Sequence, residues 1–330
     1  MKPNRRVLVL DRLRFAVGGS VATMELADIP AARENRLPDV PLLNPLLQRA
    51  GRWLFGGPHP EVTTTERTIP GSVGPLTVRV HTPSSRPGPR PLLVHLHGGG
   101  WVLGSTEGYD PLCTGLAHDL GAVVVSVDYR MAPEDPAPAA VDDCIAATAW
   151  VAEHAHELGA DGDARVAVIG DSAGGNLAAL VAIAARDGRA PTLAAQVLIY
   201  PATDLTRSSP SMARLTEEPL LSRADIDRFV SLYLGTGTDR ETAADDPRVS
   251  PAFASDLSGL APALVITAEH DPLIDEGVAY AKRLHAAGVE VRHTTYVGVP
   301  HGFLSVPGVC PPARQAGAEI VAELRRHLDV

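Results

Sequence analysis

Directly after the apolar run Val166–Ile169 the chain reads Gly170-Asp-Ser-Ala-Gly-Gly175, and an alanine-rich stretch then continues to Arg186. This order predicts a buried strand, a tight turn and a helix, with the hydroxyl of Ser172 projecting above the end of the strand. The glycines let strand and helix approach closely, and the helix N-terminus offers unpaired N–H groups that favour developing negative charge. A glycine-rich helix start without a catalytic role is the alternative, because G-x-S-x-G arises by chance in roughly one such chain in ten.

Around this turn, short apolar runs alternate with helical stretches. An antiparallel pair of half-buried strands is expected first, at Val62–Thr68 and Leu76–Thr82. Strands buried on both faces and separated by helices then predict a mostly parallel sheet of the α/β class. The expected buried strands are Leu92–Leu96, Ala122–Val127, Val166–Ile169, Ala194–Ile199, Ala263–Thr267 and Glu290–Val297, and the expected helices are Pro138–Leu158, Ala173–Arg186, Glu276–Ala287 and Arg314–Leu328.

Two segments depart from this alternation. The first sixty residues are rich in proline and show no alternating strand pattern, so residues 1–60 are expected to form an N-terminal cap on a main domain at 61–330. The segment Asp204–Ser255 holds a helical stretch, Ser222–Leu234, but no convincing buried strand. We expect this excursion (204–255) to contribute to the cap, because α/β sheets bind ligands at the carboxyl ends of their strands.

Charge and cysteine usage exclude several classes of protein. The 330 residues carry 29 basic and 39 acidic side chains, which argues against nucleic-acid or anionic-membrane partners, since binding phosphates needs a positive face. The three cysteines form no CxxC pair, so neither a disulfide framework nor a cysteine zinc site is expected. Charged residues interrupt the apolar run Val7–Leu10, so no signal peptide or membrane span is expected. These features predict a cytoplasmic protein.

A second glycine-rich stretch, His97-Gly-Gly-Gly-Trp101, follows the expected strand Leu92–Leu96. Successive glycines let backbone N–H groups turn toward a ligand at little steric cost. In an acyl-transfer enzyme such groups, together with the N–H of Ala173, hold the oxyanion of the tetrahedral intermediate. An ordinary flexible loop and a phosphate cradle are the alternatives, but the chain shows neither a P-loop lysine nor a G-x-G-x-x-G spacing.

A serine nucleophile needs a base, and the base needs an acid that orients it. Asp271 and His301 each follow one of the last two expected strands. Both therefore lie in loops at the edge of the sheet where Ser172 emerges, in the order serine, acid, histidine that α/β-hydrolases use. Asp271 and His301 are accordingly the preferred acid and base.

Other residues could take these two roles. They are the acids Glu269, Asp275 and Glu276 and the histidines His95, His97, His270 and His293. Asp275 and Glu276 fall where the next helix begins, a position where acids stabilise the helix dipole. We expect Asp171 to support the turn at Ser172, and Asp128-Tyr-Arg130 to form a structural ion pair. No HExxH motif or clustered ligands occur, so no metal is expected.

Together these motifs resemble the bacterial hormone-sensitive-lipase family (family IV) of carboxylesterases, over the chain from about Val62 to its end. The motifs are His97-Gly-Gly-Gly-Trp, Asp128-Tyr-Arg-Met-Ala-Pro-Glu, Gly170-Asp-Ser-Ala-Gly-Gly, Asp271-Pro-Leu and His301-Gly-Phe. The resemblance implies an α/β-hydrolase fold with a helical cap. It also implies a triad of Ser172, Asp271 and His301, with Gly98, Gly99 and Ala173 as oxyanion donors. The departures, Asp135 for a common histidine and Ile274-Asp275 for a common Arg-Asp, touch none of the triad.

The activity that this resemblance implies is hydrolysis of carboxylic esters without a cofactor. An amidase, peptidase or lactonase on the same fold, or a hydrolase-like protein that only binds a ligand, are the alternatives. Aromatic residues are only 4%, and charges gather in the expected cap at Arg33, Glu34 and Arg36 and at 223–228. We therefore expect a closed pocket bounded by Trp101 that takes short- to medium-chain esters. A homodimer through the edge of strand Glu290–Val297 is also expected.

Overall fold

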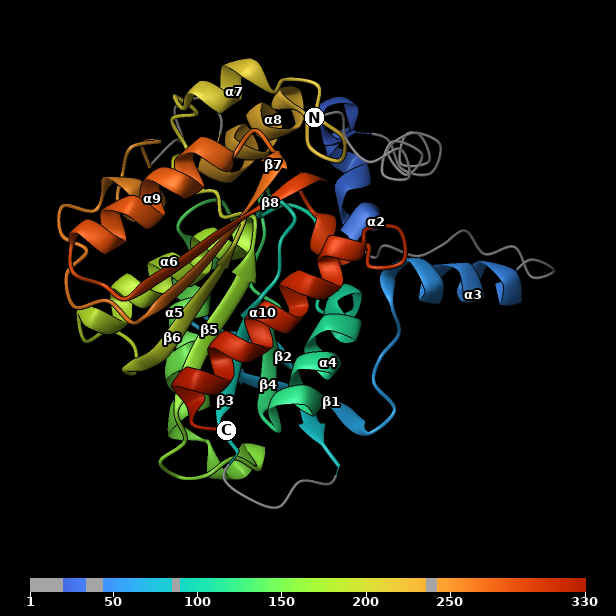
Figure 1. Ribbon diagram of the computed structural model, residues 1–330, viewed down its shortest axis with the longest axis vertical. Helices are drawn as coiled ribbons and strands as arrows, with labels where there is room; N and C mark the ends of the chain where they lie inside the picture. Colours follow the sequence, from blue (N-terminus) through green and yellow to red (C-terminus); the bar gives the residue numbers. More distant parts are fainter. Residues whose placement is uncertain (1–19, 34–43, 85–89, 236–241) are drawn as a thin grey trace.

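The computed structural model of the chain describes residues 20–33, 44–84, 90–235 and 242–330. An eight-stranded sheet runs through the molecule in the order β1-β2-β4-β3-β5-β6-β7-β8 (Figure 1). β2 is antiparallel to both of its neighbours, and all other neighbouring strands are parallel. The predicted antiparallel pair and parallel α/β sheet are thus confirmed. The strands are β1 (Val62–Pro70), β2 (Pro75–Pro83), β3 (Leu92–Leu96), β4 (Val123–Val127), β5 (Val166–Asp171), β6 (Leu193–Ile199), β7 (Ala263–His270) and β8 (Val291–Pro300).

Helices cover both faces of the sheet. Side chains of β3 alternate between two buried cores, with Leu92, Val94 and Leu96 in one and Leu93 in the other. Strands that are buried on both faces need apolar residues at every position, which explains the continuous apolar runs of the sequence. One face packs against α5 (Ala139–Glu153), α6 (Ala173–Arg186) and α9 (Ile274–Ala286), and the other against α4 (Asp110–Leu120) and α10 (Pro311–Leu328).

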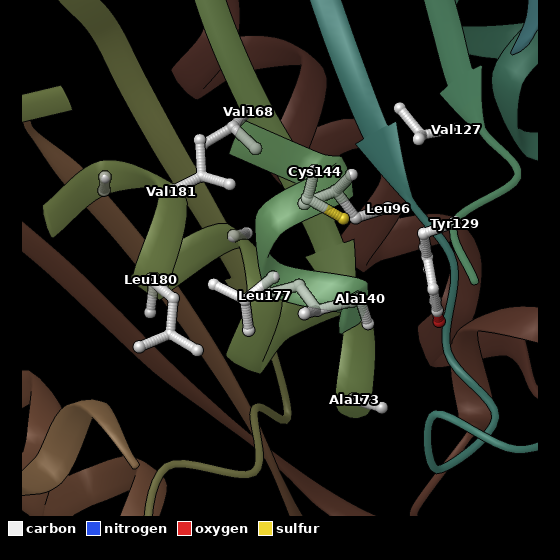
Figure 2. Close-up of a cluster of buried hydrophobic side chains, with 14 of the residues drawn as sticks. Leu96, Val127, Tyr129, Ala140, Cys144, Val168, Ala173, Leu177, Leu180 and Val181 are labelled. Carbon is white, nitrogen blue, oxygen red and sulfur yellow. The ribbon is translucent and has the colours of Figure 1, made fainter. Parts of the chain in front are cut away.

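Helix α6 lies at the centre of the larger core. Figure 2 shows Leu177 of α6 next to Ala140 of α5, within the same cluster as Cys144 of α5 and Leu96 of the sheet. All residues of α6 from Ala173 to Ala184 are buried, and alanine and glycine make up much of this run. Small side chains on every face let the helix pack closely against the strands and against α5. The position of its first residue is therefore fixed by the core.

The excursion at 204–255 contains helices and, in its described residues, no strand. Its described α-helices are α7 (Pro210–Arg214) and α8 (Arg223–Leu234), and a 3-10 helix follows at Pro251–Phe253. α8 begins with a capping box, in which Ser222 and Asp225 each accept a backbone N–H group from the other. The sequence analysis anticipated α8 but missed α7, whose single turn is too short for a periodic pattern.

Described residues of the N-terminal region contact the excursion and the residue that follows the glycine loop, His97–Trp101. The Ser20 hydroxyl donates to the carboxylate of Asp225 on α8. Arg33, which ends α2 (Ile29–Arg33), donates from Nε to the carbonyl oxygen of Val102 at 2.8 Å. The first contact joins the N-terminal region to the excursion; the cap and its boundaries at 60, 204 and 255 stay predictions. The expected cap residues Glu34 and Arg36 and the apolar run Val7–Leu10 lie outside the described residues.

The ion pair expected at Asp128-Tyr-Arg130 has a different partner. Arg130 donates from Nε to Asp143 of α5 at 2.8 Å, whereas Asp128 is exposed. Asp143 is buried, so it needs a cation more than the solvated Asp128 does. In the part of the chain that is described, no helix combines the length and the apolar character that a membrane crossing requires.

The turn between β5 and α6 brings the start of α6 against the end of β3. Ser172 has φ 57° and ψ −118°, a strained combination for a residue with a side chain. A Cβ atom at Gly174 would lie 2.0 Å from the carbonyl oxygen of Leu96. Glycine is therefore required there by the close approach of the two backbones, as the sequence analysis anticipated.

Replacing Gly174 by alanine should destabilise the protein, by about 2 kcal/mol or more, because the added methyl group clashes with backbone that cannot move freely. Gly115→Ala is the matched control, since Gly115 lies in α4 and a Cβ there meets nothing within 4 Å. The control should stabilise the protein by up to about 1 kcal/mol through helix propensity. Urea unfolding of both variants measures the difference, and equal effects would contradict the close approach.

Candidate active site

Three side chains from separate loops meet above the carboxyl ends of the parallel strands. The hydroxyl of Ser172 lies 2.9 Å from Nε2 of His301, and Nδ1 of His301 lies 2.7 Å from Oδ2 of Asp271. Asp271 is fully buried, and its other oxygen accepts the backbone N–H group of Leu273 at 2.8 Å. The structure thus brings together the serine, base and acid that the sequence analysis preferred, in one chain of hydrogen bonds.

The alternative acids and bases are engaged elsewhere. Each of them is hydrogen-bonded or ion-paired with a group outside the triad, whereas Asp271 and His301 contact each other. The contacts are Glu269 with the N–H of Gly298, Asp275 with Arg214, Glu276 with the N–H of Thr203, His270 with Glu218, His293 with Thr267, and His95 with Ser126.

The glycine loop differs from expectation at its first glycine. The N–H group of Gly98 donates to Oδ1 of Asp171 at 3.0 Å and also lies 3.1 Å from the hydroxyl oxygen of Tyr109. Gly98 is therefore not free to bind an oxyanion, and its expected role is corrected. Within residues 90–235, the N–H groups of Gly99, Gly100 and Ala173 have no hydrogen-bond acceptor. These three groups are therefore the candidate oxyanion donors.

Comparisons with known proteins agree with this geometry. A family model described as alpha/beta hydrolase fold matches residues 93–305, which is well over half of the chain. The chain belongs to the hormone-sensitive-lipase family of α/β-hydrolases. The chain is 45% identical over 276 residues to carboxylic ester hydrolase LipN of Mycobacterium tuberculosis. This alignment covers 82% of this chain and 72% of the relative.

Two further relatives share the chemistry or the fold. Ethyl acetate hydrolase of Pseudomonas putida is 42% identical over 239 residues, or 72% of this chain and 73% of its own. The solved structure of a hyperthermophilic esterase from the archaeon Pyrobaculum calidifontis aligns with a TM-score of 0.83 and 40% identity, over 99% of each chain. The predicted family and fold are both confirmed.

In this member of the family, Asp171 connects the serine turn to the glycine loop. Besides accepting the N–H of Gly98, its carboxylate accepts the hydroxyl of Tyr109 at 3.1 Å. Burial raises the pKa of the Asp171 carboxyl to about 6, against which the hydrogen bond from Tyr109 acts. The expected support role of Asp171 therefore has a specific form, since this carboxylate fixes the loop relative to Ser172.

His97 shapes the same loop from its other side. Its Nδ1 donates to the carbonyl oxygen of Gly98 at 2.8 Å, and its ring stacks on Tyr129 with centroids 4.3 Å apart. Burial lowers the pKa of His97 to about 4, so its imidazole is neutral near pH 7. These contacts give His97, one of the alternative bases, a role in fixing the loop.

Trp101, which is expected to bound the pocket, packs its ring against the excursion. Its side chain is only 2% exposed, and its ring stacks on Tyr233 of α8 with centroids 4.3 Å apart and planes 7° apart. Another residue of α8, Phe229, covers the backbone of Gly100, where a Cβ atom would lie 2.3 Å from its ring. The excursion thus rests directly on the glycine loop, and Trp101 serves that packing.

Two side chains, Asn176 and Glu276, hold the backbone where the excursion leaves and rejoins the sheet domain. The sequence analysis did not predict this role for either. Asn176 of α6 donates its amide to the carbonyl oxygens of Ala202 and Val249 at 2.7 and 2.8 Å. Glu276 accepts consecutive N–H groups at 203–204, and burial raises the pKa of its carboxyl well above the usual value. Asn176 follows the serine motif at once, but its partners are far away in sequence, so no local signal identifies the role.

Replacing Asp171 by asparagine should raise the melting temperature more at pH 8 than at pH 5. Because the native pKa is raised, the native state binds more protons than the unfolded chain between about pH 4 and pH 6. The free energy of unfolding therefore falls as pH rises through that window, by about 3 kcal/mol in total. Asparagine does not ionise, so the variant does not lose this stability.

Calorimetry of parent and variant at the two pH values makes the test. Asp163→Asn, at an exposed position, is the control and should change the melting temperature equally at both. If Asp171→Asn also changed the melting temperature equally at both pH values, the pKa of Asp171 would not be raised.

Proposed function

We propose that the chain is a serine carboxylesterase that hydrolyses short- to medium-chain esters through an acyl-enzyme on Ser172. The observation that carries this proposal is the unbroken relay from Oγ of Ser172 through the His301 ring to Asp271, at 2.9 and 2.7 Å. Carboxylic ester hydrolysis itself follows from the family and from the named relatives, one of which is called ethyl acetate hydrolase. The residue roles are our assignment.

In the first half of the reaction, Nε2 of His301 accepts the proton of Ser172 while Oγ attacks the ester carbonyl carbon. The carbonyl π electrons move onto oxygen, and the N–H groups of Gly99, Gly100 and Ala173 stabilise the resulting oxyanion. Collapse of this intermediate breaks the bond to the alcohol oxygen, which takes the proton from His301. The acyl group remains on Ser172.

In the second half, water replaces the alcohol. Nε2 of His301 accepts a proton from water, whose oxygen attacks the acyl carbon, and collapse releases the acid and returns the proton to Ser172. Asp271 stabilises the imidazolium in both halves and keeps the neutral ring protonated on Nδ1, because that N–H donates to Oδ2. No residue of this cycle needs a cofactor.

Ser172→Ala should fold and lose nearly all esterase activity, with a fall in kcat on the order of 10⁴–10⁶, because the attacking atom is gone. Hydrolysis of p-nitrophenyl butyrate measures the loss. A folded variant that keeps a tenth of the parent activity would show that Ser172 is not the nucleophile.

The acid is tested by a matched pair of substitutions. Asp271→Asn should lower kcat by several orders of magnitude, since the ring loses its orienting charge. Asp275→Asn removes a carboxylate four residues away that instead faces Arg214 at 3.6 Å, and it should keep most of the activity. The reverse order of effects would assign the acid to Asp275.

The size of the acyl group should be limited by the excursion. Phe229 rests on Gly100, and α8 carries charged pairs such as Arg223 with Asp227 at 3.0 Å, which give it little apolar outer surface. Each methylene inside an apolar site gains about 0.8 kcal/mol, and each one beyond its wall gains nothing or clashes. Specificity should therefore peak at an intermediate length.

For p-nitrophenyl esters, kcat/KM should be highest at acyl lengths of roughly four to six carbons and fall by about ten. Steady-state kinetics along the homologous series, below the solubility limit of each ester, gives the profile. Values that continue to rise to palmitate, with activation by emulsified triglyceride, would instead indicate a lipase.

An amidase, peptidase or lactonase would use the same relay, so matched ester and amide substrates with one acyl group must separate them. A protein that only binds its ligand would not need the complete relay. We retain the ester assignment because the named relatives are ester hydrolases.

Assembly and location complete the proposal. β8 is an edge strand of the sheet, and Val297 on it is 57% exposed, which supports a homodimer formed by pairing of two β8 strands. Light scattering at micromolar concentration distinguishes one chain of 34.7 kDa from two.

All three cysteines, Cys113, Cys144 and Cys310, are free and buried, which supports a reducing, cytoplasmic compartment.

A further inference from the structure

Three potential metal ligands lie together away from the triad. His59 and Glu61 precede β1, and His118 lies in the last turn of α4. One ligand atom of each side chain lies within 4.8 Å of the others, and this is the one such group that residues 20–33, 44–84, 90–235 and 242–330 contain. We propose that His59, Glu61 and His118 bind a divalent transition-metal ion, and that zinc suits their two nitrogens and one oxygen best.

His118 is held in the form that a metal ligand requires. Its Nδ1 lies 2.9 Å from Oδ1 of Asp119, so the ring proton is placed on Nδ1 and the lone pair on Nε2. That Nε2 lies 3.4 Å from Oε2 of Glu61. Two donors at about 2.0–2.2 Å from a tetrahedral zinc ion are about 3.3 Å apart, so this pair already has the required separation. A carboxylate behind a ligating histidine is a frequent support of zinc sites.

The third ligand completes the group after one rotation. The rings of His59 and His118 stack with centroids 3.7 Å apart and planes 22° apart. Two nearly parallel rings cannot both direct a lone pair at one ion, so His59 turns when the ion binds. The hydrogen bond that this turn breaks is weak, since Nδ1 of His59 accepts the N–H of Glu61 at 3.3 Å. A water molecule can take the fourth position, because the Glu61 side chain is 63% exposed.

The local charge favours a cation. Glu61 and Asp119 contribute two negative charges on either side of the His118 ring, which a divalent ion would balance. A second state would satisfy the same contacts without a metal, namely a protonated His118 between the two carboxylates. Zinc binding, measured directly, separates the two.

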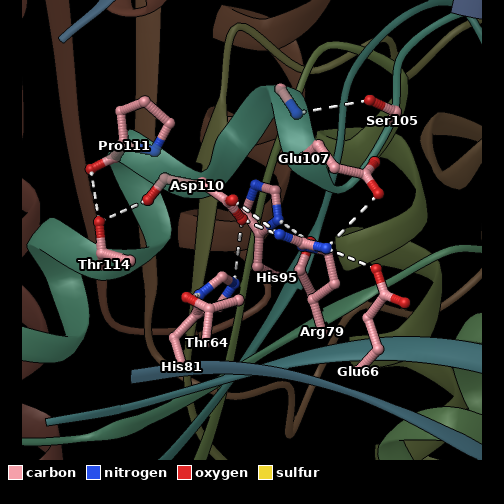
Figure 3. Close-up of polar contacts among 12 residues, drawn as sticks. Thr64, Glu66, Arg79, His81, His95, Ser105, Glu107, Asp110, Pro111 and Thr114 are labelled. Atoms are coloured by element: carbon pink, nitrogen blue, oxygen red, sulfur yellow. Dashed lines mark hydrogen bonds and ion pairs between the residues drawn. The ribbon is translucent and has the colours of Figure 1, made fainter. Parts of the chain in front are cut away.

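The ion would fix the C-terminal end of α4. The other end of α4 is already held, because Arg79 of β2 donates to both oxygens of Asp110 at 2.8 and 3.1 Å (Figure 3). Near the middle of α4, the hydroxyl of Thr114 accepts the N–H of His59 at 2.8 Å. The ion would therefore join α4 to the segment between α3 (Asn44–Phe55) and β1. Helix α3 extends away from the sheet (Figure 1), so this connection would hold the C-terminal end of α3 to α4. The ion would therefore affect the stability of the protein rather than ester hydrolysis.

The test titrates the full chain, without any polyhistidine tag and after EDTA has been removed, with zinc chloride in a calorimeter. We expect one zinc ion per chain with a Kd of about 10 μM or tighter. At a zinc concentration ten times Kd, the melting temperature should rise by about 2 °C. The initial rate of ester hydrolysis should stay within about a fifth of the zinc-free rate, so the result is independent of the proposed function.

Matched variants locate the ion. His118→Asn and Glu61→Gln should each weaken zinc binding at least about tenfold, while His156→Asn, at an exposed histidine outside the group, should bind as the parent does. The site would be overturned if the parent binds no zinc up to about 1 mM, the result expected if a protonated His118 simply bridges the two carboxylates. It would also be overturned if His118→Asn keeps the parent Kd or if His156→Asn loses binding.

Discussion

The close approach of the first turn of α6 to the end of β3 determines the rest of the site. Gly174 lies against the carbonyl oxygen of Leu96, where no larger residue fits, and Ser172 takes a strained backbone conformation as a result. The burial of α6 between the sheet and α5 stabilises this arrangement, because moving the turn would disturb the core. With α6 in this position, the hydroxyl of Ser172, the N–H of Ala173 and the loop after β3 share one small volume. The relay to His301 and Asp271 depends on that placement.

Asp171 illustrates how function and stability oppose each other here. Its buried carboxylate ties the glycine loop to the serine turn through Gly98 and Tyr109, which aligns the remaining N–H groups of the loop with Ser172. Burial makes the ionised form costly, as its raised pKa shows. A neutral side chain at this position would make the fold more stable. The ionised carboxylate therefore destabilises the fold at the position that sets the oxyanion geometry.

Much of the fold and of the triad could be predicted because each follows from a local pattern. Strands buried on both faces require continuous apolar runs, and loops after parallel strands necessarily meet at one edge of the sheet. That logic placed Ser172, Asp271 and His301 together, and the structure brings their side chains into contact.

The remaining features depend on contacts between distant segments, which no local pattern encodes. Gly98 resembles its neighbouring glycines in sequence, yet its N–H group is taken by Asp171. Trp101 stacks on Tyr233 of the excursion, a contact that the residues around Trp101 do not indicate. His59 and His118 belong to different elements, so their stacking could not be anticipated from spacing. In each case the decisive partner lies far along the chain.

The covalent intermediate gives the most direct test of the account. The protein is mixed with p-nitrophenyl butyrate, quenched in acid within the first turnover, digested, and its peptides are weighed by mass spectrometry. We expect a mass increase of one butyryl group on the peptide that contains Ser172, and this increase disappears as the acyl-enzyme hydrolyses. Release of p-nitrophenol with no adduct on that peptide, or with the adduct on another side chain, would contradict it.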